Sequence, residues 1–228
     1  MSRLILHRAF GSPPARSVMM LSDILGLQME YKDVNILLGE QKLPEFKKLN
    51  PMRTVPVLED DGFILSESHA ILKYLTAKYG DKEQQERWYP SSLRTRSIVD
   101  QTMFFNAGVF FIAFRDAAFA TMFGGATEPT PQNIKSIESS YEIAEAYLLK
   151  RKYMAADHMT LADLCTGTTA TVAQIIHKVN SDRYPRYADW LTKMQEEPVF
   201  QKVNSPGVVF MEKLFNKMWK ENRSRQTK

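Results

Sequence analysis

The order of strand and helix patterns in the first 81 residues is the feature that most limits the fold. The run Leu4–Leu6 is short and apolar, as in a buried strand, and a helical pattern that begins with a proline follows from Pro13. Leu27, Met29 and Tyr31 then alternate with polar residues, which predicts a half-buried second strand. A unit of this kind has two parallel strands joined by a right-handed crossover helix.

A different unit follows. We predict a short polar helix over residues 43–49, a strand over 55–58, a turn, a partner strand over 63–65 and a helix that ends at Gly80. The order βαβ and then ββα predicts a four-stranded mixed sheet with helices packed on it, which is the thioredoxin-like plan. Pro56 stands inside a predicted strand, where proline is unusual. We therefore expect a cis peptide bond between Val55 and Pro56.

Strand patterns disappear in the second part of the chain. Residues 82–92 are polar, contain Pro90 and lack periodicity, so we expect a linker. From Leu93 onward the patterns are helical, and the most apolar stretch, 93–122, is expected to be the central helix of a bundle. The predicted fold class is an α/β thioredoxin-like domain at residues 1–81, a linker at 82–92 and an all-α bundle domain at 93–228.

Composition excludes several classes of function. The net charge is +4 over 228 residues, but Lys and Arg are interleaved with acids, so we expect no nucleic-acid partner. The only cysteine, Cys165, excludes an internal disulfide and is expected to be a core residue. The four histidines lack ligand spacing, so no metal site is expected. No run approaches the ~18 apolar residues of a membrane span. We therefore expect a cytoplasmic protein with no membrane partner.

Two serines mark a candidate anion-binding cleft. Ser12 lies between the first strand and the helix that begins with Pro13, and Ser68 opens the helix after the 63–65 strand. Free N–H groups and the helix dipole favour anions at such positions. Helix capping alone also explains either serine.

Several linked motifs, in the same order, resemble the insect delta- and epsilon-class glutathione transferases. They cover nearly the whole chain and comprise Ser12-Pro13-Pro14-Ala15-Arg16, Val34-Asn35, Leu38-Gly39-Glu40, Pro44-Glu45-Phe46, Leu49-Asn50-Pro51, Thr54-Val55-Pro56-Val57-Leu58, Glu67-Ser68-His69-Ala70-Ile71-Leu72 and Thr160-Leu161-Ala162-Asp163-Leu164.

This resemblance implies a glutathione-binding first domain and a second domain that binds the electrophile. Ser12 would donate a hydrogen bond to the glutathione sulfur and favour the thiolate. Glutathione would be a co-substrate, with no cofactor. The residues implied to bind it are Gln41, Arg53, Val55, Pro56, Glu67, Ser68 and His69. The chain departs from the family at Gln41 and Arg53, where histidine is frequent, and at His69, where arginine is frequent.

The second substrate is expected against the central helix. Seven of the 13 phenylalanines fall between residues 104 and 123. Position in the family indicates Phe104, Phe111, Phe114 and Arg115 as the cleft wall, and so an apolar electrophile. Reduction of hydroperoxides is compatible with the same site. The alternative function is a non-catalytic carrier of hydrophobic ligands such as steroids. The family also implies a two-fold homodimer.

Overall fold

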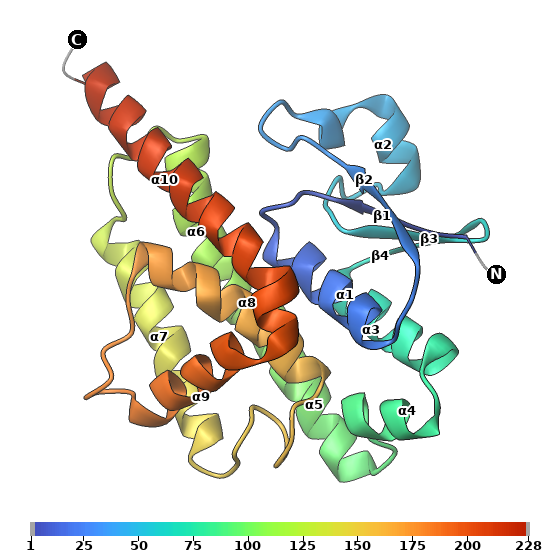
Figure 1. Ribbon diagram of the computed structural model, residues 1–228. Helices are drawn as coiled ribbons and strands as arrows, with labels where there is room; N and C mark the ends of the chain where they lie inside the picture. The colour runs from blue at the N-terminus through green and yellow to red at the C-terminus, as the bar shows by residue number, and fades with distance from the viewer. Residues whose placement is uncertain (1–2, 227–228) are drawn as a thin grey trace.

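The computed structural model describes residues 3–226, which form a small sheet domain packed against a larger bundle of helices (Figure 1). The outer ends of the two predicted domains, residues 1–2 and 227–228, lie outside the described residues. The elements of the first domain are β1 (Leu4–Arg8), α1 (Pro13–Ile24), β2 (Met29–Asp33), η1 (Glu40–Lys42), α2 (Pro44–Leu49), β3 (Val57–Asp60), β4 (Phe63–Ser66) and α3 (Ser68–Tyr79).

The sheet has the predicted mixed topology. Its strand order is β2-β1-β3-β4, with β1 and β2 parallel and the other two pairs antiparallel. The Val55–Pro56 peptide is cis, as expected, and β3 begins directly after it. The predicted alternation of β2 holds in part: Leu27 and Met29 are partly buried against the core, whereas Tyr31 is 40% exposed on this edge strand.

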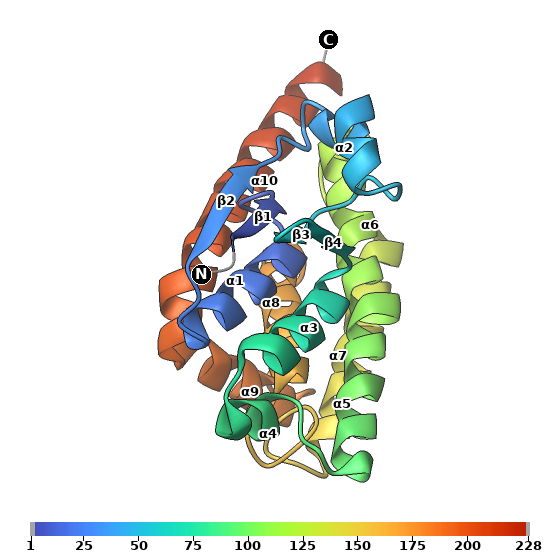
Figure 2. The same ribbon diagram turned by 90° about the vertical axis from the view of Figure 1, so that its right-hand side faces the viewer.

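Both faces of the sheet carry helices. Leu6 and Leu58 belong to the main core with Val18 of α1 and Ile71 of α3. On the other face Phe46 of α2 packs in a small separate cluster with Val34 and Val57. Figure 2 shows α1 and α3 side by side under the strands, with α2 on the far side of the sheet. α1 and α3 are thereby sandwiched between the sheet and the bundle.

The segment 82–92, predicted as a linker without regular structure, contains the helix α4 (Lys82–Trp88). A capping box starts this helix: the Asp81 carboxylate accepts from the Gln84 N–H at 2.8 Å, and the Gln84 side chain accepts from the Asp81 N–H at 3.0 Å. Trp88, only 4% exposed, anchors its last turn. The segment carries too few apolar residues for periodicity to reveal a helix of this length.

The second domain is all helical, as predicted. Its elements are α5 (Leu93–Phe105), η2 (Asn106–Phe110), α6 (Phe111–Met122), α7 (Pro131–Leu148), α8 (Leu161–Ile176), α9 (Pro185–Glu196), η3 (Phe200–Asn204) and α10 (Ser205–Gln226). Both η2 and η3 are π-helical turns. α5, η2 and α6 form one continuous helix at the centre of the bundle.

This central helix, Leu93–Met122, is long and apolar enough to span a membrane, with a mean hydropathy of 1.4 in the qualifying window. The sequence prediction that no run reaches ~18 apolar residues still holds here, because Asn106, Arg115 and Asp116 interrupt the apolar stretch. The measure rests on length and composition only, and the core helix of a folded bundle also satisfies it. Phe110, Ala113 and Phe114 of this helix pack inside the bundle.

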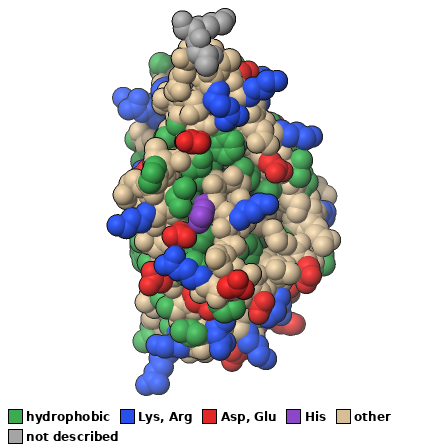
Figure 3. All heavy atoms as spheres, turned by 90° about the vertical axis from the view of Figure 1, so that its left-hand side faces the viewer, with side chains coloured by type: hydrophobic (Ala, Val, Ile, Leu, Met, Phe, Trp, Pro, Cys, Tyr) green, Lys and Arg blue, Asp and Glu red, His purple; other side chains and the backbone are tan. Residues whose placement is uncertain are grey.

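The bundle face turned away from the sheet has a mixed character (Figure 3). Basic and acidic side chains are interspersed on it, with apolar side chains between them. No stretch of a single sign of charge dominates this face, in agreement with the interleaved charges of the sequence.

Candidate functional site

Strand register brings three of the predicted segments, the Ser12 loop, Val55-Pro56 and Glu67-Ser68, to one end of the sheet. β1 and β3 are antiparallel with His7 opposite Val57, so the end of β1 lies beside the start of β3. Val57 in turn pairs with Ser66, so the end of β4 lies there too. The loop that carries Ser12, the cis peptide before Val57 and the start of α3 therefore meet at this edge.

Ser12 is the N-cap of α1. Its hydroxyl oxygen accepts a long hydrogen bond of 3.4 Å from the Ala15 N–H, and its own N–H donates to the Ala9 carbonyl at 2.9 Å. The side chain is only partly covered. Within residues 3–226 its hydroxyl hydrogen has no acceptor, so the group is able to donate to a ligand.

Glu67 and Ser68 begin α3. Glu67 is its N-cap, with φ of 71° and no side-chain capping bond, and its side chain is exposed. A glutamate at positive φ is strained and persists only where its surroundings hold it. Ser68 is buried in the first turn, where backbone N–H groups lack helical partners. The pair thus offers an exposed carboxylate next to an electropositive helix end.

The loop before the cis peptide is organised by Asn50. Its buried side chain donates to the Thr54 carbonyl at 2.9 Å, and its amide oxygen accepts from the Met52 N–H at 3.0 Å. This loop places Arg53 in the left-handed region at φ 57°, with an exposed side chain. Gln41, in η1, donates weakly to the Ile36 carbonyl at 3.4 Å, while its buried Oε1 has no protein partner among the described atoms.

His69 joins the two domains. Its Nε2 lies 3.2 Å from the Asn106 amide nitrogen, in the π-turn of the central helix. Burial, and to a lesser extent the charge of Lys73, lower the pKa of His69 to about 4. His69 is therefore neutral at physiological pH and accepts the hydrogen bond from Asn106. No partner for His69 could be assumed from the sequence, and the structure shows that the partner is Asn106.

The four residues predicted to form the cleft wall lie in different environments. Phe111 is partly covered and its ring lies 6.4 Å from that of Phe114. Phe114 itself is 3% exposed and packs against Phe215. It is therefore a core residue and does not line the surface of a cleft. Arg115 pairs with Asp116 at 2.8 Å. Phe104 is 74% exposed beside Lys73 of α3, and its ring centroid lies 6.0 Å from the Lys73 ammonium.

Sequence reasoning missed the contribution of α10. A Cβ on Gly11, next to Ser12, would lie 2.5 Å from the Met211 sulfur and 3.1 Å from the Phe210 ring. The Phe210 ring also packs edge-on against Phe10, with centroids 5.7 Å apart. Phe10 and Phe210 are 36% and 44% exposed, so they offer an apolar surface directly beside the Ser12 loop. The run Val208–Met211 is visible in the sequence, but nothing local to it indicates the partner.

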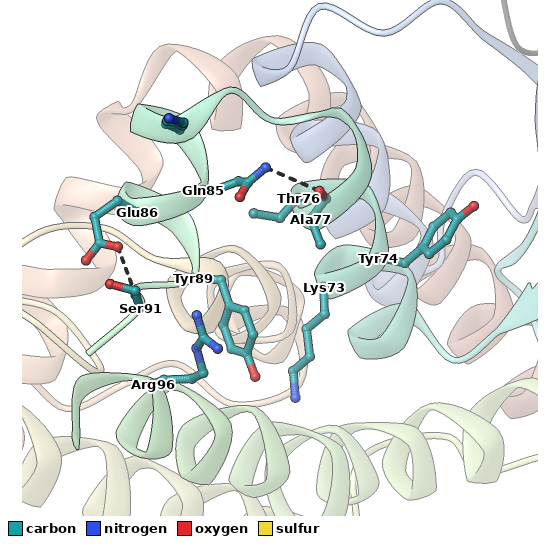
Figure 4. A pocket seen from close by; sticks show the side chains of 10 residues that line it. Lys73, Tyr74, Thr76, Ala77, Gln85, Glu86, Tyr89, Ser91 and Arg96 are labelled. Atoms are coloured by element: carbon teal, nitrogen blue, oxygen red, sulfur yellow. Dashed lines mark hydrogen bonds between the residues drawn. The ribbon is translucent and has the colours of Figure 1, made fainter. Parts of the chain in front are cut away.

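A cavity of about 580 Å³ lies elsewhere, between α3, α4 and α5 (Figure 4). Lys73, Tyr89 and Arg96 point into it, and the Arg96 guanidinium lies 4.7 Å from the Tyr89 ring centre. None of the predicted glutathione residues lines it. The site at the sheet edge is therefore distinct from this cavity.

Comparison with known proteins identifies the family. The family description "Glutathione S-transferase, N-terminal domain" matches residues 6–83, and "Glutathione S-transferase, C-terminal domain" matches residues 116–198. Glutathione S-transferase 1 of Manduca sexta is 37% identical over 90% of this chain and 93% of its own length. Glutathione S-transferase D7 of Anopheles gambiae is 35% identical over 95% of this chain and 99% of its own.

Solved structures agree. An epsilon-class glutathione S-transferase from the housefly, Musca domestica, superposes with a TM-score of 0.90 at 34% identity, covering 95% of this chain and 98% of that one. A glutathione transferase homologue from a Drosophila species, solved with bound glutathione, superposes with a TM-score of 0.88 at 32% identity, covering 97% and 98%. The resemblance seen in the motifs is confirmed: the chain belongs to the glutathione S-transferase family, and to the insect type within it.

Proposed function

We propose that the protein conjugates reduced glutathione to apolar electrophiles and that Ser12 holds the glutathione sulfur as a thiolate. The observation that carries this proposal is the Ser12 hydroxyl, which caps α1 through its oxygen and keeps its hydrogen available. A hydrogen bond from this hydroxyl to sulfur favours the thiolate over the thiol and so lowers the thiol pKa. The serine stays protonated and forms no covalent intermediate.

The rest of glutathione follows the sheet edge. The Val55 backbone, next to the cis peptide, pairs with the cysteinyl backbone of glutathione in the manner of an added strand. The carboxylate of the γ-glutamyl residue accepts hydrogen bonds from the N–H groups at Ser68. The ammonium of the same residue pairs with the exposed Glu67 carboxylate. The glycyl carboxylate lies near Arg53 and Gln41, where Arg53 supplies a charge that histidine lacks at neutral pH.

The electrophile binds on the apolar surface made by Phe10 and Phe210, which adjoins the Ser12 loop. In the reaction the thiol proton passes to solvent, and a sulfur lone pair forms the new carbon–sulfur bond. The leaving group departs with the electron pair of the bond that breaks. Thiolate stabilisation and proximity of the two substrates supply the rate increase.

The protein acts as a cytoplasmic two-fold homodimer in this proposal. β4 is an edge strand with Phe63 49% and Ile64 41% exposed, and Leu93 and Phe104 of α5 are also strongly exposed. Exposed apolar side chains on a sheet edge are a liability unless a partner covers them. Sedimentation velocity tests this, and Phe63→Glu is expected to yield monomers.

The activity is tested by glutathione conjugation of a generic aryl halide. Ser12→Ala is expected to lower kcat/KM about 100-fold, the scale for loss of one preorganised donor, with glutathione affinity by calorimetry nearly unchanged. Ser17→Ala is the matched control, since Ser17 lies in the same helix and its hydroxyl donates to the Pro14 carbonyl at 2.8 Å. If neither the native protein nor the variants turn over while apolar ligands bind, the carrier function replaces conjugation.

A further inference from the structure

Behind Ser12 lies a buried cation without a counter-ion. Arg16, one turn further along α1, is 1% exposed and is among the largest fully buried side chains of the protein. Burial lowers the pKa of its guanidinium to about 9, so the group is still charged at neutral pH. Isolated charges are rarely buried, because their loss of hydration is not offset unless an opposite charge is near.

All partners of this guanidinium are neutral. Its Nε donates to Asn204 Oδ1 at 2.8 Å and its Nη1 donates to the Gly11 carbonyl at 2.6 Å. Its Nη2 is buried without any hydrogen-bond acceptor among the described atoms. Across residues 3–226 no carboxylate pairs with it and no other ionisable group is in hydrogen-bonding contact. Asn204 is held in turn by a bond from its Nδ2 to Thr171 Oγ1 at 3.0 Å.

The guanidinium of Arg16 contacts the Ser12 loop directly. Gly11, whose carbonyl accepts from the Arg16 guanidinium, immediately precedes Ser12. α10 closes over the guanidinium at Gly207, where any Cβ would lie 2.8 Å from Nη1. Water is thus excluded from the side of the guanidinium that faces the bundle. In such surroundings of low dielectric constant, a charge interacts more strongly with another charge at a given distance.

We propose that Arg16 is a positioning residue whose unpaired charge, together with its grip on the Gly11 carbonyl, stabilises the thiolate of bound glutathione. The inference rests on the proposed function, because the anion that it assigns to Arg16 is the glutathione sulfur. The protein leaves the cation unpaired in the free state, and the substrate supplies the negative charge. A carboxylate beside Arg16 would cancel this effect before substrate arrives.

Asn204→Asp tests this directly. The substitution is isosteric, keeps the acceptor at Oδ1 and places a negative charge 2.8 Å from Arg16 Nε without touching the loop. The measurement is the pKa of glutathione bound to the protein, from the ultraviolet absorbance of the thiolate against pH. We expect Asn204→Asp to raise that thiol pKa by about one unit, the scale of two charges roughly 10 Å apart at an effective dielectric near 20.

Further variants separate charge from structure. Arg16→Met removes the charge and is expected to raise the thiol pKa by a similar amount, while Arg16→Lys retains most of the native value. Thr171→Val breaks the second bond of Asn204 without altering any charge and is expected to leave the thiol pKa unchanged. Should Arg16→Met fail to fold, Asn204→Asp decides alone.

The outcomes also separate this inference from the proposed function. If native protein lowers the thiol pKa and Ser12→Ala raises it, but Asn204→Asp and Arg16→Met do not, the role of Arg16 is overturned and that of Ser12 stands. If glutathione bound to the native protein titrates like free glutathione, thiolate stabilisation itself fails.

Discussion

The buried carboxylate of Asp163 accepts a hydrogen bond from the indole Nε1 of Trp190 at 3.0 Å and thereby ties the start of α8 to the middle of α9. The same carboxylate accepts from the Met154 N–H and the Thr160 N–H, both at 2.9 Å. Burial raises the pKa of Asp163, while these hydrogen bonds act in the opposite direction. One side chain therefore satisfies donors from three segments of the bundle.

Asp163→Ala is expected to destabilise the protein by at least about 3 kcal/mol, because it leaves several buried donors without an acceptor. Urea unfolding followed by circular dichroism measures the loss. Asp157→Ala is the control, since Asp157 is exposed in the preceding segment, and a change within about 0.5 kcal/mol is expected there. Equal midpoints for the two variants would contradict the assigned role.

Gly207→Ala is expected to destabilise the protein by about 1 to 3 kcal/mol, since its Cβ would overlap the Arg16 side chain. Gly108→Ala, in the π-turn η2, has no atom within 4 Å of the new Cβ. That control is expected to be neutral or to stabilise by up to about 1 kcal/mol. Thermal unfolding of the two variants side by side checks the difference.

The lowered pKa of His69 predicts that the folded protein loses stability in acid. Its folded-state pKa of about 4 lies below the ordinary value of 6.5, so between these pH values the unfolded chain binds the proton and the folded protein does not. Stability from this group is complete above pH 6.5 and falls as the pH drops toward 4, by about 3 kcal/mol in total at 1.36 kcal/mol per unit.

Urea midpoints of native protein and His69→Gln, measured between pH 4 and 7, check this expectation. The variant keeps a hydrogen-bonding group for Asn106 but cannot titrate, so its stability should vary less with pH in this window. Parallel curves for the two proteins would show that His69 is not the source.

Cys165 is expected to be unreactive in the folded protein. It is 2% exposed, and burial raises the pKa of its thiol to about 12, so the nucleophilic thiolate is scarce at neutral pH. A chromogenic disulfide reagent should react slowly with native protein and with one thiol per chain in denaturant. Rapid labelling of native protein that abolishes activity would argue for a cysteine in the mechanism.

The first domain could be predicted from sequence because its signals are local. Pro13 marks the start of α1, and Asp61-Gly62 marks the turn between β3 and β4. The residues predicted to bind glutathione come from short motifs of the family resemblance, such as Val55-Pro56 and Glu67-Ser68. The contacts of η3 and α10 with α1 and the Ser12 loop could not be predicted, because they join segments about 190 residues apart, as in the bond from Arg16 to Asn204.

Other differences have similar physical causes. The π-turn at Asn106–Phe110 leaves no periodic trace, since one extra residue shifts the phase of an apolar helix that is already buried on several sides. Phe104 and Phe114 are alike in the sequence, yet one is 74% and the other 3% exposed. Phe114 packs against Phe215 of α10, a contact with a distant part of the chain that the local sequence does not reveal.

η3 and α10 belong to the second domain, yet they supply contacts to the Gly11–Ser12 loop and to Arg16 in the first domain. A ribosome that has released residues 1–81 has yet to synthesise Asn204, Gly207 and Met211, so the loop acquires its final support only when the chain is almost complete. Exchange of whole domains between relatives would likewise separate Arg16 from the surface that encloses it. The thiol chemistry proposed for this protein therefore depends on the first domain together with α10, the last helix of the chain.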